Sequence, residues 1–148
     1  MKSETWNLIE EFFVDSPTLK SESVSYELID KEFNENGFVI PESYREFIHR
    51  YGGAILGAYS VYGVGSCKLM GNDTESVFKV TDGFKAQGWP GVEEWLVISM
   101  DAAGNPIGMD TGGKIWISDV VHGCIDELAD DFEEYVLEWC LDFEDEED

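Results

Sequence analysis

The sequence predicts a single α+β domain, built on a mainly antiparallel, twisted sheet that is flanked by N-terminal helices and a C-terminal amphipathic helix. Two observations predict this class. Apolar residues recur at helical spacing near both ends of the chain, and short apolar runs separated by turns rich in Gly, Asn and Asp lie between them. Helices on either side of a run of strands are typical of α+β domains. Because 148 residues suit one domain, we place it at residues 1–142, followed by an acidic tail at residues 143–148.

Three helices are expected in the first third of the chain, at residues 4–14, about 25–34, and 41–51. Pro41 suits the first turn of the third helix, and Gly52-Gly53 supplies its end. Each helix has an apolar face, formed by Trp6, Ile9 and Phe13, by Leu28, Ile29 and Phe33, and by Tyr44, Phe47, Ile48 and Tyr51.

After Gly53 the pattern changes to short runs rich in β-branched and aromatic residues. Turns at residues 101–105 and 110–113 separate successive runs, which predicts an antiparallel meander. We expect strands at residues 55–62, 76–81, 95–100, 106–109 and 114–118.

A strong amphipathic helix is expected at about residues 126–142. Asp126 and Glu127 stand at its expected start, where the helix dipole favours negative charge. Its apolar face is formed by Leu128, Phe132, Val136 and Trp139.

The chain is strongly acidic, with 32 Asp and Glu against 9 Lys and Arg and a net charge of −23. Residues 126–148 hold 13 of the acids and no Lys or Arg. This charge argues against binding to nucleic acid or to an anionic membrane surface, both of which need a basic footprint, and it favours a cationic partner. The last seven residues are six carboxylates and Phe143, a composition typical of a solvated, frayed tail.

The sequence favours a cytoplasmic protein. It shows no cationic segment followed by an apolar run, the pattern of a secretory signal, and no apolar stretch long enough to span a bilayer. The cysteines Cys67, Cys124 and Cys140 are widely spaced and form no disulfide framework. We expect buried or partly buried free thiols in a reducing compartment.

Catalytic and metal-binding patterns are not recognisable. The two histidines, His49 and His122, have no partners at zinc-ligand or triad spacing. We expect His49 to be an exposed or half-exposed helix residue and His122 to make a structural hydrogen bond at a strand edge or turn. Asp101, Asn105 and Asp110 do not follow the spacing of a calcium loop, and we expect them to cap their own turns. No catalytic residue, metal site or cofactor is therefore predicted.

Four stretches in order resemble the SUKH superfamily of Smi/Knr-type domains, over about residues 24–140. The first is similar to the pattern L-P-x-x-Y-x-x-F-L followed by N-G-G, and the others resemble a strand and turn, a second strand, and a helix start. Ser99, Asp131 and Tyr51 depart from the usual residues of these motifs. The four stretches are residues 40–53, 95–105, 114–116 and 128–136.

The resemblance implies a non-enzymatic, protein-binding domain. In bacteria such domains are typically immunity proteins, antitoxins that bind and neutralise a cognate polymorphic toxin, often a nuclease, in the producing cell. A nuclease offers a basic surface, so an acidic inhibitor complements its charge.

We expect the contact surface on the acidic face of the last helix, together with a loop whose tryptophan can anchor an interface. The expected contact residues are Trp89, Glu93, Glu94, Asp130, Asp131, Glu134 and Glu138.

Three other functions fit the sequence. One is a regulatory or scaffold module that binds a cellular protein, as in the fungal cell-wall regulator of the superfamily. A DNA mimic would titrate many DNA-binding proteins, and a hydrolase would need two converging carboxylates in unequal environments.

Overall fold

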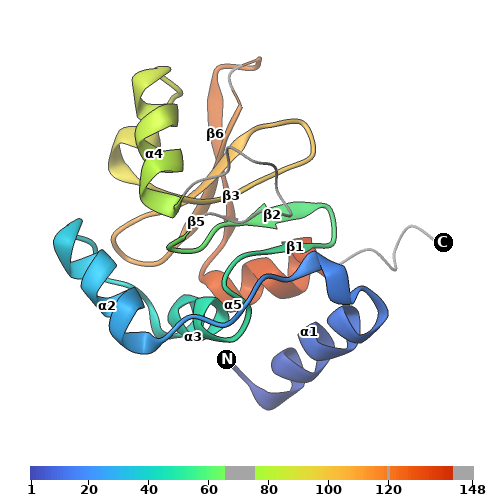
Figure 1. Cartoon of the computed structure of the whole chain (residues 1–148). Coiled ribbons are helices and arrows are strands. Elements are labelled where there is room, and N and C mark those ends of the chain that lie inside the picture. The colour runs from blue at the N-terminus through green and yellow to red at the C-terminus, as the bar shows by residue number, and fades with distance from the viewer. Residues whose placement is uncertain (66–75, 120, 142–148) are drawn as a thin grey trace, which may run out of the picture.

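The computed structural model describes residues 1–65, 76–119 and 121–141. Within them, six antiparallel strands form one sheet in the order β1-β2-β3-β4-β5-β6, so each strand pairs with its neighbour in the chain (Figure 1). The strands are β1 (Ala54–Leu56), β2 (Tyr59–Val61), β3 (Leu96–Met100), β4 (Pro106–Met109), β5 (Ile115–Asp119) and β6 (Cys124–Ala129). The predicted α+β class and the meander are confirmed.

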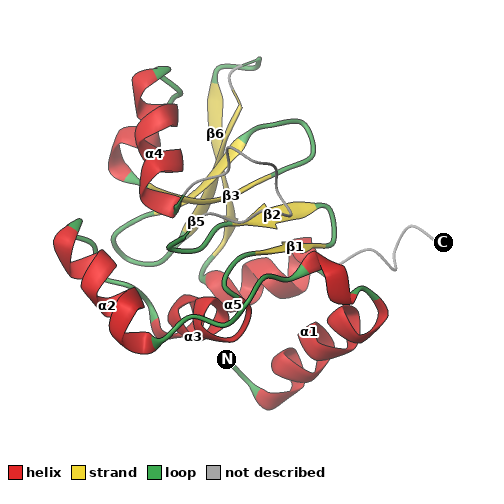
Figure 2. Ribbon diagram, viewed as in Figure 1, coloured by secondary structure: helices red, strands yellow, loops and turns green. Residues whose placement is uncertain are grey.

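The helices lie on both sides of the sheet (Figure 2). The first three confirm the expected elements: α1 (Ser3–Asp15), α2 (Tyr26–Glu35) and α3 (Glu42–Tyr51). Alternate residues of β3 show the two faces, because successive side chains of a strand point in opposite directions. Leu96 and Ile98 join the main core with α1, α2, α3 and the C-terminal helix, whereas Val97 packs with Val92 and Trp95 in a second, smaller core.

The expected strand at residues 76–81 is wrong, because this segment begins α4 (Val77–Ala86). Ser76 is its N-cap, and the hydroxyl of Ser76 accepts a hydrogen bond from the backbone N–H of Lys79 at 3.4 Å. The Thr81 hydroxyl donates to the carbonyl of Val77 at 2.7 Å and accepts from the N–H of Val97 in β3 at 2.8 Å. The strand was expected from Val77, Phe78 and Val80, but the buried residues Val77, Phe78 and Thr81 have the spacing of one helix face.

The expected helix at residues 126–142 starts too early. Residues 126–129 belong to β6, where Asp126 pairs with Ile117 and Glu127 with Trp116 of β5. The helix begins after Asp131 as α5 (Phe132–Tyr135) and continues as a π-helical turn, η4 (Val136–Cys140). Asp126 and Glu127 therefore do not cap a helix, and Leu128 lies on a strand.

The expected strand at residues 55–62 is divided into the hairpin β1–β2. Its turn contains Gly57, whose φ of +65° suits glycine. A Cβ on Gly57 would lie 2.0 Å from the backbone oxygen of Cys140, so the hairpin packs directly against η4. This contact places β2 beside the end of the C-terminal helix.

Candidate protein-binding surface

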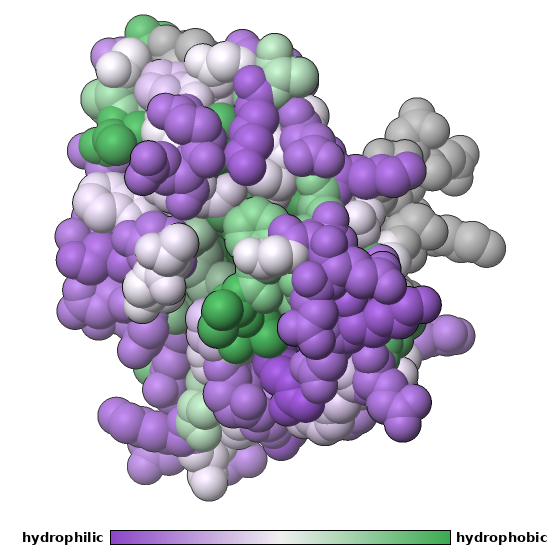
Figure 3. Space-filling view, turned by 90° about the vertical axis from the view of Figure 1, so that its left-hand side faces the viewer, coloured by the Kyte–Doolittle hydropathy of each residue, from purple (hydrophilic) through white to green (hydrophobic). Residues whose placement is uncertain are grey.

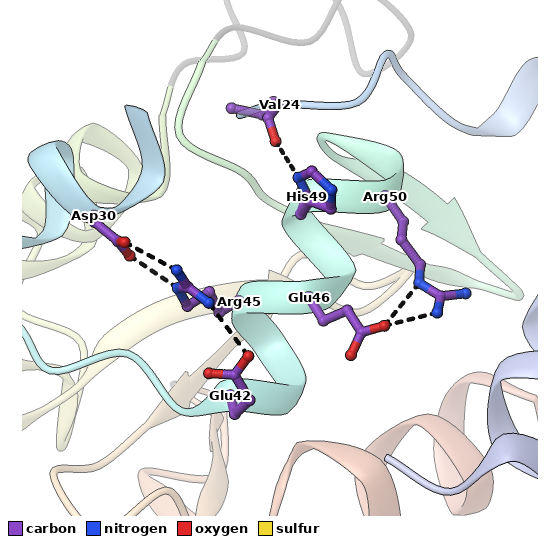
Figure 4. Close-up of polar contacts among 7 residues, drawn as sticks. All are labelled: Val24, Asp30, Glu42, Arg45, Glu46, His49 and Arg50. Atoms are coloured by element: carbon purple, nitrogen blue, oxygen red, sulfur yellow. Dashed lines mark hydrogen bonds and ion pairs between the residues drawn. The ribbon is translucent and has the colours of Figure 1, made fainter. Parts of the chain in front are cut away.

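The charged side chains of α3 find partners within the chain. Arg45 donates two hydrogen bonds to the carboxylate of Asp30, at 2.8 and 2.9 Å, and one to Glu42 at 3.3 Å (Figure 4). Its guanidinium also lies over the ring of Tyr26, 4.1 Å from the centroid. Hydrogen bonds from Arg45 lower the pKa of Asp30 below its ordinary value.

Arg50 repeats this arrangement five residues later on α3. It donates to Glu46 at 2.7 and 3.0 Å, approaches Glu10 at 3.7 Å, and lies 4.0 Å from the ring centroid of Trp6. The two arginines therefore tie α3 to α2 and α1. We call the pair, Arg45 and Arg50 with their rings and carboxylates, the α3 arginine clamps.

His49, between the clamps, joins α3 to the segment before α2 and to the start of α2. Its Nδ1 donates to the carbonyl of Val24 at 2.7 Å (Figure 4). Its ring stacks on Tyr26 with a centroid distance of 3.9 Å. The side chain is half-buried. These polar side chains of α3 therefore stabilise the packing of the helices.

The C-terminal part of the chain carries a different arrangement of charge. Residues 115–148 contain no Lys or Arg. Among the described residues of this segment, salt bridges are made by Glu127, 3.3 Å from Lys114, and by Asp119, 2.7 Å from His122. Apart from Glu133, the remaining acids around β6, α5 and η4 form what we call the C-terminal acidic surface: Asp126, Asp130, Asp131, Glu134 and Glu138.

Two acids of this surface also shape the chain. Asp131 is the N-cap of α5 and accepts from the backbone N–H of Glu134 at 2.8 Å. Glu134 accepts in turn from the backbone N–H of Asp130 at 3.1 Å. Asp130 and Glu138 are exposed, and their side chains have no hydrogen-bond or ion-pair partner within the described part of the chain. Of the acids on this surface, these two are the least committed to the fold.

Glu133 is a structural acid that the sequence did not reveal. Its carboxylate accepts from the hydroxyl of Thr5 at 2.7 Å and from the backbone N–H of Lys2 at 2.8 Å, which joins the start of α1 to α5. These hydrogen bonds lower the pKa of Glu133 below its ordinary value of 4.5. The partner residues are 128 and 131 positions away, so no local pattern indicates this contact.

Among the described residues β6 is the last strand of the sheet, and Asp126 of the acidic surface lies on this edge strand. The other edge, β1, is covered by the chain before α2, where Lys20 bridges to Ala54 and Ser21 donates to the carbonyl of Gly53 at 2.9 Å. On β6 the first four residues are exposed, including Ile125 at 43%. Charged side chains such as Asp126 keep an open edge from pairing indiscriminately with other strands.

A hollow next to this edge combines aromatic, apolar and acidic side chains. It has a volume of about 490 Å³ and is lined by Tyr59, Leu128, Glu138 and Trp139. Trp139 is 40% exposed, and its indole N–H donates to the carbonyl of Leu128 at 2.9 Å. Trp139 was expected on the core face of the helix, but the core positions are Phe132, Tyr135, Val136 and Cys140. We call this site the Trp139 hollow.

The structure separates the predicted contact residues into two groups. Trp89 packs against the second core, on the opposite face of the sheet from α5, whereas Glu93 and Glu94 belong to the short 3-10 helix η3 (Val92–Glu94) that precedes β3. Glu93 and Glu94 are exposed as expected, whereas Trp89 is half-buried against Phe84, with ring centroids 5.5 Å apart. The loop tryptophan is therefore partly used in packing.

The side of the molecule that carries α2 and α4 shows an apolar patch among hydrophilic residues (Figure 3). Glu94 lines a small pocket of about 140 Å³ there, together with Val39, Leu96 and Met109. Val39 is 94% exposed. Asp110 and the half-buried ring of Phe38 also line this pocket.

The turn acids have the expected capping role. Asp101 accepts from the backbone N–H groups of Ala103 and Asn105, and Asp110 accepts from those of Gly112 and Lys114. Within the described residues, no three His, Cys, Asp or Glu side chains are grouped so as to hold a metal ion. Nor does that part of the chain include a helix long and apolar enough to cross a membrane.

Two cysteines can be placed. Cys140 is buried, as expected, but Cys124 is exposed, because it starts the open edge strand. Cys67 and the predicted frayed tail at residues 143–148 lie outside the described residues.

Comparison with known proteins supports the resemblance found in the sequence. A search of curated proteins gives no significant match. The SMI1 / KNR4 family (SUKH-1), in contrast, matches residues 24–138, which run from the segment before α2 to η4. The chain therefore belongs to the SMI1 / KNR4 family of SUKH domains.

Proposed function

We propose that this chain is an immunity protein that binds and neutralises a cognate toxin with a basic surface, such as a nuclease, in the cytoplasm of the producing cell. Family membership is consistent with a protein-binding role. The observation that carries the proposal is the C-terminal acidic surface, because residues 115–148 hold no Lys or Arg to neutralise it. A basic protein partner would supply the missing charge.

Charge complementarity gives the proposed complex its speed. Opposite charges on two proteins steer their encounter and raise the association rate, an effect that salt screens. A nuclease grips phosphates with Lys and Arg, so an acidic domain on that surface competes with the nucleic acid for the same cations. Inhibition then needs no chemical step by the immunity protein.

The buried titratable groups are consistent with a binding role. Tyr135 shares a hydrogen bond of 2.7 Å with the hydroxyl of Ser99, which donates to the carbonyl of Ser60 at 2.6 Å. Burial raises the pKa of Tyr135 and of Cys140 well above their ordinary values, so both stay neutral. These groups support the packing of α5 and η4 on β2 and β3.

The proposal is tested by expressing the chain together with the toxin domain encoded by the neighbouring gene. We expect growth to be rescued and the two proteins to purify as a complex. A variant with Asp126→Asn, Asp130→Asn and Glu138→Gln should protect less well. A matched variant with Glu4→Gln, Glu27→Gln and Glu35→Gln changes the net charge equally on exposed positions of α1 and α2, and it should protect as well as the parent chain.

Other outcomes favour the alternative functions. A lack of protection, together with a stable complex with a housekeeping protein, would support a regulatory or scaffold module. Comparable binding to many unrelated basic proteins would support a DNA mimic. Either result would overturn the immunity function.

A further inference from the structure

The Trp139 hollow contains the same parts as the α3 arginine clamps, except for the arginine. In each clamp a guanidinium lies about 4 Å from an aromatic ring, at 4.1 Å from Tyr26 and 4.0 Å from Trp6, and pairs with carboxylates. The hollow offers two aromatic rings, Tyr59 and Trp139, and the carboxylate of Glu138.

The hollow is held in place before any partner arrives. The hydrogen bond from the Trp139 indole to Leu128 restrains the exposed ring, and Leu128 is part of β6. Tyr59 is held by an edge-to-face contact with Tyr135, whose ring is fully buried, at a centroid distance of 5.8 Å. A ring and a carboxylate that are already positioned lose little conformational entropy when they bind a cation.

The sequence around Glu138 and Trp139 offers no Lys or Arg that could pair with the carboxylate of Glu138. The last basic residue before the C-terminus is Lys114, which pairs with Glu127 on β6 at 3.3 Å. Glu138 has no salt-bridge partner among the described residues.

We propose that the Trp139 hollow receives an arginine side chain from the surface of a protein partner, which completes there the clamp that Arg45 and Arg50 complete within the chain. The inference rests on the proposed function, because it names the side chain by which the toxin would be recognised. Arginine fits better than lysine, since a planar guanidinium can stack on a ring while its N–H groups donate to a carboxylate. The apolar stem would lie against Leu128.

The test uses the full chain, labelled with ¹⁵N, and a small probe in place of the partner. Acetyl-arginine amide is titrated while the indole N–H signals are followed by NMR, and the Trp139 signal is identified by its loss in Trp139→Phe. Acetyl-citrulline amide, which has nearly the same shape without the charge, is the matched probe. Glu138→Gln tests the carboxylate, and Glu94→Gln is the control for an exposed acid that does not line the hollow.

We expect the arginine probe to shift the Trp139 signal in a saturable way and the citrulline probe to leave it unchanged. Glu138→Gln should weaken binding by about three-fold, the size of a partly exposed ion pair, and Glu94→Gln should not. An unchanged Trp139 signal, or equal weakening by both variants, would overturn the inference. If such a result came from a chain that still protects against its toxin, the proposed function would stand without the hollow. Binding of the probe by a chain that gives no protection would instead overturn the function alone.

Discussion

Helix α3 and the C-terminal region both bring carboxylates next to aromatic rings, but they differ in where the positive charge comes from. On α3, Arg45 and Arg50 belong to the chain and hold the first three helices together. At the Trp139 hollow the chain has no such residue, and Glu138 stays exposed. The difference indicates that charge serves folding in one region and is left for a partner in the other. The predictions below test this division.

The largest effect is expected from the apolar face of α3. Phe47 is fully buried and its ring packs edge-to-face with Tyr51 and Phe132. Phe47→Ala should lower the free energy of unfolding by about 3–5 kcal/mol, because it leaves a cavity where three elements meet. Urea denaturation measures the loss, with Glu138→Gln as the control that should leave stability nearly unchanged. Similar losses for the two variants would erase the proposed difference between the regions.

A smaller effect is expected from breaking one α3 arginine clamp. Arg50→Ala removes the cation from the ring of Trp6 and from two carboxylates, which should lower the free energy of unfolding by about 1 kcal/mol. Denaturation with urea checks it. Lys31→Ala serves as the control. Lys31 is an exposed residue of α2, and its ammonium group makes no hydrogen bond or ion pair with the described residues. If both variants lost the same stability, net charge alone would explain the result.

Glu133 sharpens the comparison, because this C-terminal acid does serve the fold. Glu133→Gln should cost about 1 kcal/mol near neutral pH, since a neutral amide accepts the hydrogen bonds of Thr5 and Lys2 less strongly. The pKa of Glu133 is lowered in the folded state, so its charge stabilises the fold above the ordinary value of 4.5 and this contribution is lost as the pH falls through the lower, folded pKa.

The measurement is the difference in the free energy of unfolding between the parent chain and Glu133→Gln at several pH values. The difference should shrink in acid, below 4.5. A difference that stays constant with pH would show that the ionised carboxylate is not what stabilises this contact.

The smallest effect concerns the turn before β6. The imidazole of His122 lies 2.7 Å from the carboxylate of Asp119, and this contact raises the pKa of His122 above its ordinary value of 6.5. In Asp119→Asn the pKa should fall towards 6.5, because the charged imidazolium loses its partner. NMR titration of the two histidines measures this shift, with His49 as the internal reference. An unchanged His122 pKa would mean that this exposed pair does not form in solution.

Local patterns were sufficient for much of the fold. The α3 face of Tyr44, Phe47, Ile48 and Tyr51 repeats at helical spacing, and its residues are buried as predicted. The Gly, Asn and Asp residues after β3 and β4 correctly predicted two turns. The prediction failed at α4 and β6, because contacts with residues distant in the sequence determine the secondary structure of these short segments. Thr81 of α4 accepts a hydrogen bond from Val97, and residues 124–129 pair with β5.

The candidate site was only partly predictable for the same reason. The sequence indicated an acidic C-terminal region, and it named Asp130, Asp131, Glu134 and Glu138. The capping of α5 by Asp131 and Glu134 was missed although an Asp followed by a Glu three positions later is a local signal of a helix start. The Trp139 hollow was hidden because it joins Tyr59 of β2 to residues of β6 and η4, about half the chain away.

The central claim is that the C-terminal acidic surface recognises a basic partner. Its most direct test is the association rate of the chain with the toxin domain encoded by the neighbouring gene, measured by stopped flow at low and at physiological salt. The triple variant at Asp126, Asp130 and Glu138 should associate more slowly, by about ten-fold at low salt, and the difference should narrow as salt rises. The variant with the same charge change on α1 and α2 should associate nearly as fast as the parent chain. Equal rates for the two variants would contradict the claim.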